Sequence, residues 1–207
     1  MKYARKIPQT DPELREALLT EGWGKIREAP YLFLAFLLSI PFMITNASIC
    51  YLVLFLIDPF YTNIINDFLF SGSWSFTIRF DYIIYVYMFI VAHEFIHLLF
   101  IPNFYRSEKT FFGIKPWGGF VFTTEKLSKG RFLLVTVAPF VIISILMPFV
   151  LGLAGLLSGF LVFIVFLNAF SSSVDMLNAF TIVIQVPNGS MIVNNGFETY
   201  YYNDASI

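Results

Sequence analysis

Four long apolar stretches separated by polar segments dominate the pattern of hydrophobic and polar positions along the chain. Each is at least as long as the roughly 20 residues that an α-helix needs to cross a bilayer. They occupy residues 31–57, 80–101, 132–153 and 160–184. The pattern therefore predicts an all-α integral membrane protein with about four transmembrane helices.

The segments at the two ends of the chain are polar and carry weaker patterns. In residues 1–29, Thr10 and Glu13 fit a capping box around Pro12, which predicts a short amphipathic helix lying on the membrane surface. Residues 185–207 contain two Asn-Gly turn signals and predict a small hairpin in a C-terminal tail.

Two polar connections separate the apolar stretches in the first two thirds of the chain. Residues 58–79 carry Asp-Pro and Ser-Gly-Ser turn signals and are predicted to form a loop. In the second connection, short runs at 110–114 and 120–124 flank a Gly-Gly turn. This arrangement predicts a small cytoplasmic hairpin between the second and third spans.

Composition and charge agree with membrane insertion and set its direction. The chain is 57% hydrophobic and 13% charged, whereas soluble domains carry roughly 25% charged residues. Its net charge of −1 gives the protein no excess positive charge that would attract nucleic acid. Lysine and arginine gather before the first span and between the second and third, which places both termini in the cytoplasm of a multi-pass cell-membrane protein. These residues are Lys2, Arg5, Lys6, Arg15, Lys25 and Arg27, then Arg106, Lys109, Lys115, Lys126, Lys129 and Arg131.

The second stretch contains an HExxH motif made of His93, Glu94 and His97, and the chain has no other histidine. Histidines four residues apart share one helix face, so both rings can reach one metal ion, most often zinc. The glutamate between them is the residue expected to take a proton from an attacking water. The alternative is a packed, hydrogen-bonded histidine pair, which is less favoured because polar groups at membrane depth are costly.

A catalytic zinc requires three protein ligands, so one more must come from elsewhere in the chain. Asp175 is the only acid in the interior of another predicted span, while Glu108, Glu125 and Glu198 lie in cytoplasmic segments and stay candidates. His97 lies 17 residues into its stretch and Asp175 lies 15 residues into a parallel one. At about 1.5 Å per residue, both sit about 22–26 Å from the outer face. The alternative for Asp175 is a hydrogen bond between helices.

Asn168 lies two helical turns before Asp175 on nearly the same face. It is a candidate to bind the substrate backbone or an oxyanion, and simple packing between helices is the alternative. The serines at 171–173 lack a free histidine to serve as their base, so they are interpreted as small packing residues.

These motifs resemble known membrane peptidases. HExxH in one span, a passing span and then an aspartate is similar to the core of site-2 intramembrane metalloproteases. The chain from Phe80 to the tail, with residues 126–133 and 172–175, resembles more closely a bacterial membrane family of zincin peptidases. The resemblance implies zinc bound by His93, His97 and Asp175. The chain differs from site-2 proteases in having Met176 directly after Asp175, where those enzymes usually carry glycine.

The sequence therefore predicts a membrane-embedded zinc metalloprotease with Glu94 as its general base. Residues 1–29, 30–184 and 185–207 would be the N-terminal segment, the four-span metalloprotease-like domain and the tail. Its partners would be membrane lipid and a peptide or membrane-protein substrate, which could add as a strand to the cytoplasmic hairpin. The alternatives are a metal-binding transporter and a catalytically inactive membrane scaffold.

Overall fold

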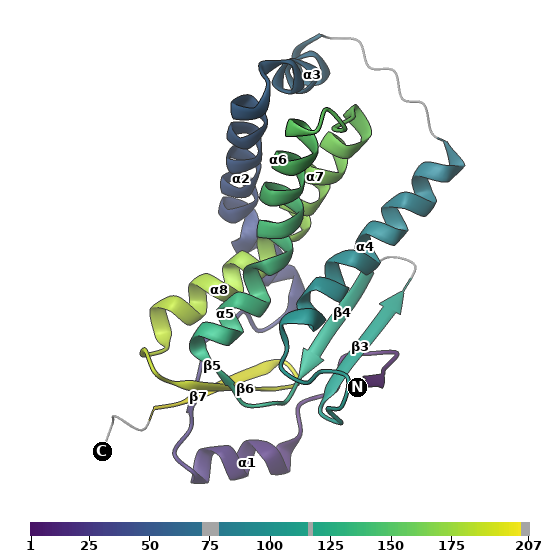
Figure 1. Cartoon of the computed structure of the whole chain (residues 1–207). Helices are drawn as coiled ribbons and strands as arrows, with labels where there is room; N and C mark the ends of the chain where they lie inside the picture. Colours follow the sequence, from purple (N-terminus) through teal and green to yellow (C-terminus); the bar gives the residue numbers. More distant parts are fainter. Residues whose placement is uncertain (72–78, 116–117, 204–207) are drawn as a thin grey trace.

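The computed structural model describes residues 1–71, 79–115 and 118–203. Its long helices extend to one side, and two small sheets lie together at the other end (Figure 1). Three helical segments are long and apolar enough to cross a membrane, and a bent pair of helices supplies a fourth if it counts as one span. The chain is thus mostly helical, with apolar helices typical of a membrane protein.

The candidate spans begin and end close to the predicted positions. The first two are α2 (Leu32–Ile57) and α4 (Phe80–Phe100). The third runs without a break through α5 (Lys129–Pro139), a π-helix η1 (Phe140–Leu146) and α6 (Met147–Leu153). The fourth consists of α7 (Gly159–Ser171) and α8 (Ser173–Gln185), which meet at an angle of 41° at Ser172.

The prediction of a loop over residues 58–79 was wrong for its first half. Helix α3 (Pro59–Phe70) occupies this part, and residues 72–78 lie outside the described residues. The Asp58 side chain accepts a hydrogen bond from the Phe60 N–H at 2.8 Å, and Pro59 takes the first helical position. Asp-Pro therefore starts a helix here instead of making a turn.

The expectation of a purely all-α protein was also wrong, because the segments outside the candidate spans form two sheets. One has the strand order β1-β3-β4, and the predicted hairpin of β3 and β4 is confirmed. The other has the order β2-β7-β6-β5 and contains the hairpin predicted in the tail. The strands are β1 (Lys2–Tyr3), β2 (Gly24–Lys25), β3 (Thr110–Lys115), β4 (Gly118–Thr123), β5 (Leu127–Ser128), β6 (Met191–Asn195) and β7 (Glu198–Tyr202).

Helix α1 (Pro12–Thr20) packs on the second sheet, and its location on a membrane surface stays a prediction. Leu18 and Trp23 bury their side chains against Val193 and Tyr200. Its N-cap is Asp11, which accepts from the N–H groups of the next turn, and not Thr10. The two ends of the chain thus share one hydrophobic core.

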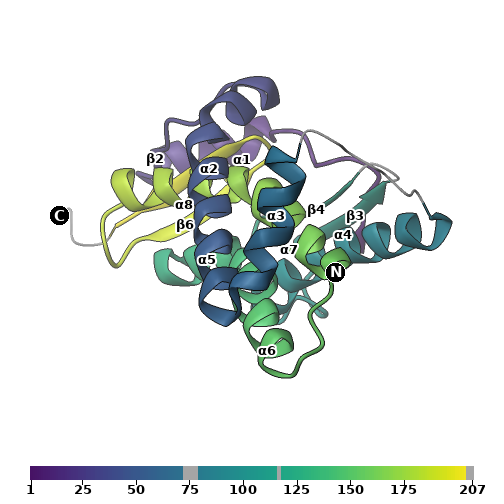
Figure 2. The same ribbon diagram turned by 90° about the horizontal axis from the view of Figure 1, so that it is seen from above.

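The spans form a bundle from which α4 diverges. Cys50, Phe140, Val165 and Ala169 form a buried cluster that joins α2, η1 and α7. Seen from above, α4 projects to one side, away from these helices (Figure 2). Large apolar side chains of α2 and α4 remain exposed, including Leu32, Phe33, Phe80 and Met88. Such a surface is typical of helices that contact lipid.

Glu198 joins three elements of the core that the two ends of the chain share. It accepts hydrogen bonds from Arg15 of α1, Lys25 of β2 and the Tyr200 hydroxyl at 2.6–2.9 Å. Burial alone would raise the pKa of this carboxyl, but the hydrogen bonds from Lys25, Tyr200 and Arg15 outweigh it and lower the pKa to about 2.

We therefore expect acid to weaken this region. The lowered pKa means that the ion cluster contributes fully above the ordinary value of 4.5 and is lost as pH falls from there toward 2. Glu198→Gln should cost about 1 kcal/mol at neutral pH, since both cations are half exposed and screened. Thermal unfolding of the detergent-solubilised protein against pH measures this, and an unchanged acid dependence in the variant would contradict it.

Candidate metal centre

Helix α4 presents His93 and His97 one turn apart, with ring centroids 5.0 Å from each other. Both side chains are buried. Asp175 lies in the first turn of α8, directly after the bend at Ser172. Its Oδ2 is 3.5 Å from His93 Nε2 and 3.6 Å from His97 Nε2. The fold therefore brings together three residues that are up to 82 positions apart in the sequence.

Hydrogen bonds behind the two rings define which ring nitrogen carries the proton. His97 Nδ1 lies 2.7 Å from the Val135 carbonyl oxygen, which can only accept, so Nδ1–H is the donor. His93 Nδ1 donates to Asn168 Oδ1 at 2.8 Å. Each neutral ring is thus protonated on Nδ1, and each Nε2 presents a lone pair toward Asp175.

This arrangement fits a metal ion. In the neutral Nδ1–H tautomer two Nε2 lone pairs and a carboxylate oxygen converge, and a bound cation would remove their repulsion. The separations of 3.5 and 3.6 Å exceed ordinary hydrogen-bond lengths. They match the distance of about 3.4 Å between two ligands of a tetrahedral zinc with bonds of about 2.0–2.2 Å. All three ligand atoms lie within 4.8 Å of one another.

Asn168, a candidate for substrate binding, lies behind His93 in the structure. Its Oδ1 accepts from His93, and its Nδ2 donates to the Pro139 carbonyl and the Ser144 hydroxyl at 3.1 and 2.8 Å. The residue is completely buried. Its position suits holding the His93 ring, and the π-helix that starts after Pro139 supplies the Ser144 hydroxyl.

The other acids considered as third ligands lie elsewhere. Glu108 is exposed and pairs with Lys2, and Glu125 accepts from the Ser107 hydroxyl. Glu198 forms ion pairs with Arg15 and Lys25. Over the described ranges, His93, His97 and Asp175 are the one group of three or more such residues close enough to share an ion.

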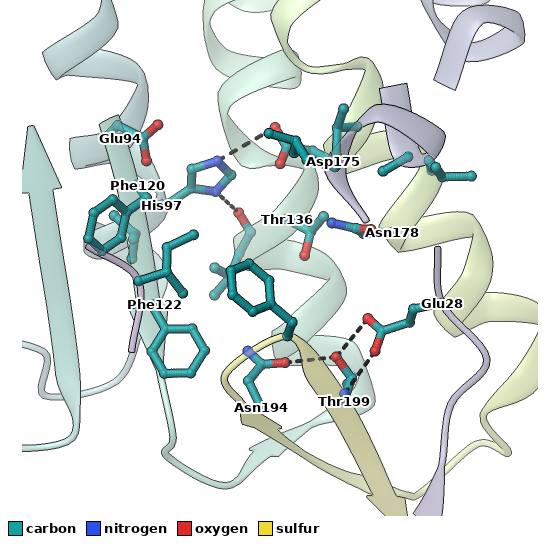
Figure 3. A pocket seen from close by; sticks show the side chains of 18 of the residues that line it. Glu28, Glu94, His97, Phe120, Phe122, Thr136, Asp175, Asn178, Asn194 and Thr199 are labelled. Carbon is teal, nitrogen blue, oxygen red and sulfur yellow. Dashed lines mark hydrogen bonds and ion pairs between the residues drawn. The ribbon is translucent and has the colours of Figure 1, made fainter. Parts of the chain in front are cut away.

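The three residues line a cavity of about 920 Å³, near the upper end of typical ligand pockets. Figure 3 shows Glu94 and Asp175 on either side of the His97 ring, with Phe120 and Phe122 of β4 along one wall. Thr136 of α5 and Asn178 of α8 also line this cavity. Asn178 was missed from the sequence, although its spacing of three residues from Asp175 indicates the same helix face.

Strand β4 runs so close to the motif that one of its residues must be glycine. A Cβ added to Gly119 would overlap the Glu94 Cγ and crowd the carboxyl carbon at 3.1 Å. The Glu94 side chain therefore packs directly against the β4 backbone, which sets the position of its carboxylate.

Gly119→Ala should therefore displace Glu94 without disturbing the histidines. We expect hydrolytic activity to fall at least about tenfold, the usual scale for a misplaced catalytic group, while zinc content is retained. Gly130→Ala, where an added Cβ meets nothing within 4 Å, is the matched control. Metal analysis and peptide hydrolysis of both variants measure this, and full activity in Gly119→Ala would show that the contact does not position Glu94.

Fold and site together define the class: a helical protein with membrane-type spans that gathers an HExxH motif and an aspartate in one cavity. Comparison with known families agrees with this class. The chain belongs to the family described as "putative zincin peptidase", whose model matches residues 85–191, a little over half of its length. No curated protein and no solved structure matches the chain.

Proposed function

We propose that this protein is a membrane-embedded zinc metallopeptidase that hydrolyses peptide bonds. The observation that carries the proposal is the convergence of His93 Nε2, His97 Nε2 and Asp175 Oδ2 in a cavity that Glu94 also lines. Membership in a family described as zincin peptidases supports it. When bound, zinc would polarise the scissile carbonyl and lower the pKa of a water molecule to about 7.

Individual residues of the chain would have separate roles in binding the metal and in transferring the proton. His93, His97 and Asp175 would bind the ion, while Asn168 and the Val135 carbonyl hold the two rings in their metal-binding tautomer. Glu94 would accept the proton of the attacking water and return it to the leaving amine. Placing this chemistry among apolar helices would make the reaction an intramembrane proteolysis, with water entering from the cytoplasmic side.

The decisive experiment removes and restores the metal. The purified protein should contain about one zinc per chain and hydrolyse an unfolded, membrane-anchored peptide, and a chelator should abolish the hydrolysis until zinc returns. A transporter would bind zinc and move it across vesicles without cleavage, whereas an inactive scaffold would purify without stoichiometric metal. Reporter fusions to both ends would test the proposed cytoplasmic location of the termini.

Strand β4 supports a mode of substrate binding. It is at the edge of its sheet, and no strand of the described residues pairs with its outer side. Its residues Gly118 to Thr123 line the cavity. We propose that an extended substrate adds to this edge, because a peptide in a helix keeps its carbonyl groups hydrogen-bonded and shielded from attack.

The register identifies the backbone groups that face the substrate. The Thr124 N–H donates to the carbonyl of Lys109, the residue before β3, so alternate residues Phe122 and Phe120 also face β3. The Phe112 carbonyl, opposite Val121, instead accepts from Ala4 on the far side. Val121 and Gly119 therefore direct their N–H and C=O groups outward.

Val121→Pro removes an outward N–H and leaves the ladder with β3 intact. We expect cleavage to fall about tenfold, on the scale of a lost backbone hydrogen bond and the added bulk of the ring, with unchanged zinc content. Phe120→Pro breaks a ladder bond to Gly113 and is the comparison that reveals damage to the hairpin itself. Unchanged cleavage by the Val121 variant would dispose of strand addition.

A further inference from the structure

The cavity has a second polar end, away from the metal ligands. Glu28 follows β2 and precedes α2, and its side chain lines the cavity together with Asn194 of β6 and Thr199 of β7. Figure 3 shows these three side chains grouped to the right of Phe120 and Phe122 and lower in the view than His97 and Asp175. One cavity thus connects the candidate catalytic residues with a carboxylate from the cytoplasmic part of the chain.

Thr199 holds the Glu28 carboxylate from one side. Its N–H donates to Glu28 Oε2 and its hydroxyl to Oε1, both at 2.8 Å. The same hydroxyl lies 3.1 Å from Asn194 Oδ1. A carboxylate has about four sites that can accept hydrogen bonds, so the two bonds from Thr199 leave about half of them open.

No cation of the described residues neutralises this carboxylate. Every lysine and arginine of the chain lies in the described ranges, and none forms an ion pair with Glu28. Glu28 is an exposed residue that also lines the cavity, so a ligand can reach its open acceptor sites. A positively charged ligand group would pair with the carboxylate and use these sites.

We propose that Glu28 is a specificity-determining residue that binds a lysine or arginine side chain of the peptide substrate. This inference rests on the proposed function. The apolar wall of Phe120 and Phe122 would cover the aliphatic stem of such a side chain, and Glu28 would bind its charged end. The enzyme would therefore prefer a basic residue at one fixed distance from the scissile bond.

Glu28→Gln separates this role from a structural one. A glutamine can accept from the Thr199 N–H with its oxygen and donate to the Thr199 hydroxyl with its amide nitrogen. That hydroxyl is then free to donate to Asn194 Oδ1, so all the hydrogen bonds around it are kept. The variant loses only the charge, and its thermal stability should match that of the wild type.

The experiment uses full-length protein in detergent micelles and a set of fluorogenic peptides. Each peptide carries lysine, norleucine or glutamate at one position near the scissile bond. We expect the wild type to prefer lysine over norleucine by about tenfold at one position, and Glu28→Gln to reduce this ratio to near one. Glu16→Gln removes the same charge from the exposed surface of α1 and should keep the preference.

Binding of the same peptides in the Glu94→Gln background distinguishes the two proposals. Tight binding of the lysine peptides without hydrolysis by the wild type would refute the peptidase function and keep the Glu28 site. Hydrolysis with no basic preference, or with a preference that survives Glu28→Gln, would overturn the role of Glu28 and leave the peptidase standing. Neither binding nor hydrolysis of any peptide would overturn both.

Discussion

Glu94→Gln should abolish most peptide hydrolysis while zinc content stays at the wild-type level. Glu94 lines the cavity next to both histidines but is not among the three residues whose ligand atoms converge. Glutamine keeps the size of the side chain and its packing against Gly119, yet it cannot accept a proton from water. General base catalysis usually contributes about 10²- to 10⁴-fold, so kcat should fall by about that factor.

The measurement compares kcat and bound zinc for the wild type, for Glu94→Gln and for a control variant in which another glutamate is replaced by glutamine. Glu108→Gln is suitable, because Glu108 is exposed, pairs with Lys2 and lies away from the cavity. A Glu94→Gln variant that hydrolyses peptides normally would remove the general base from the mechanism. Zinc transport by that variant, with no peptidase activity in the wild type, would favour the transporter.

Asp175→Ala should lose the metal itself. Its Oδ2 is the point at which both Nε2 atoms converge, so alanine leaves two imidazoles and no third protein ligand. Two ligands do not satisfy a catalytic zinc site, and we expect zinc affinity to fall by at least about 10²-fold together with activity. His93→Ala and His97→Ala should behave in the same way, whereas Glu94→Gln retains zinc.

Asn178→Ala is the matched control for zinc content. Asn178 lies one turn after Asp175 on α8 and lines the same cavity, but its neutral amide is not among the usual protein ligands of zinc. Inductively coupled plasma analysis of the purified variants, with competition by a zinc chelator, measures stoichiometry and affinity. Stoichiometric, tightly held zinc in Asp175→Ala would assign the third ligand to another group and invalidate the site as described.

The sequence predicted helices and hairpins reliably where their pattern depends on residues that are close together along the chain. The apolar stretches predicted the candidate spans, and alternating short runs around Gly-Gly predicted the hairpin of β3 and β4. Asp58-Pro59 was wrongly interpreted as a turn, whereas at Asp11-Pro12 the helix start was right and only the cap was wrongly assigned to Thr10. In both, the aspartate caps a helix and the proline takes its first position, as the hydrogen bonds of Asp11 and Asp58 show.

The sheets exposed the limit of such reasoning. Strand β2 has two residues, and its partner β7 lies more than 170 positions later in the chain. A strand this short has no periodic pattern, because its stability comes from distant partners and from the core of Leu18, Trp23 and Tyr200. The all-α expectation failed for this reason.

By itself, the sequence determined the apolar stretches and the position of His93 and His97 on one helix face, since both follow from local pattern and spacing. It narrowed the third ligand to a few acids. Only the tertiary structure decided that Asp175 converges on the two rings, that Asn168 lies behind His93, and that Glu28 shares their cavity. These relations depend on how α4, α8 and the two sheets pack, and packing between distant segments leaves no local pattern in the chain.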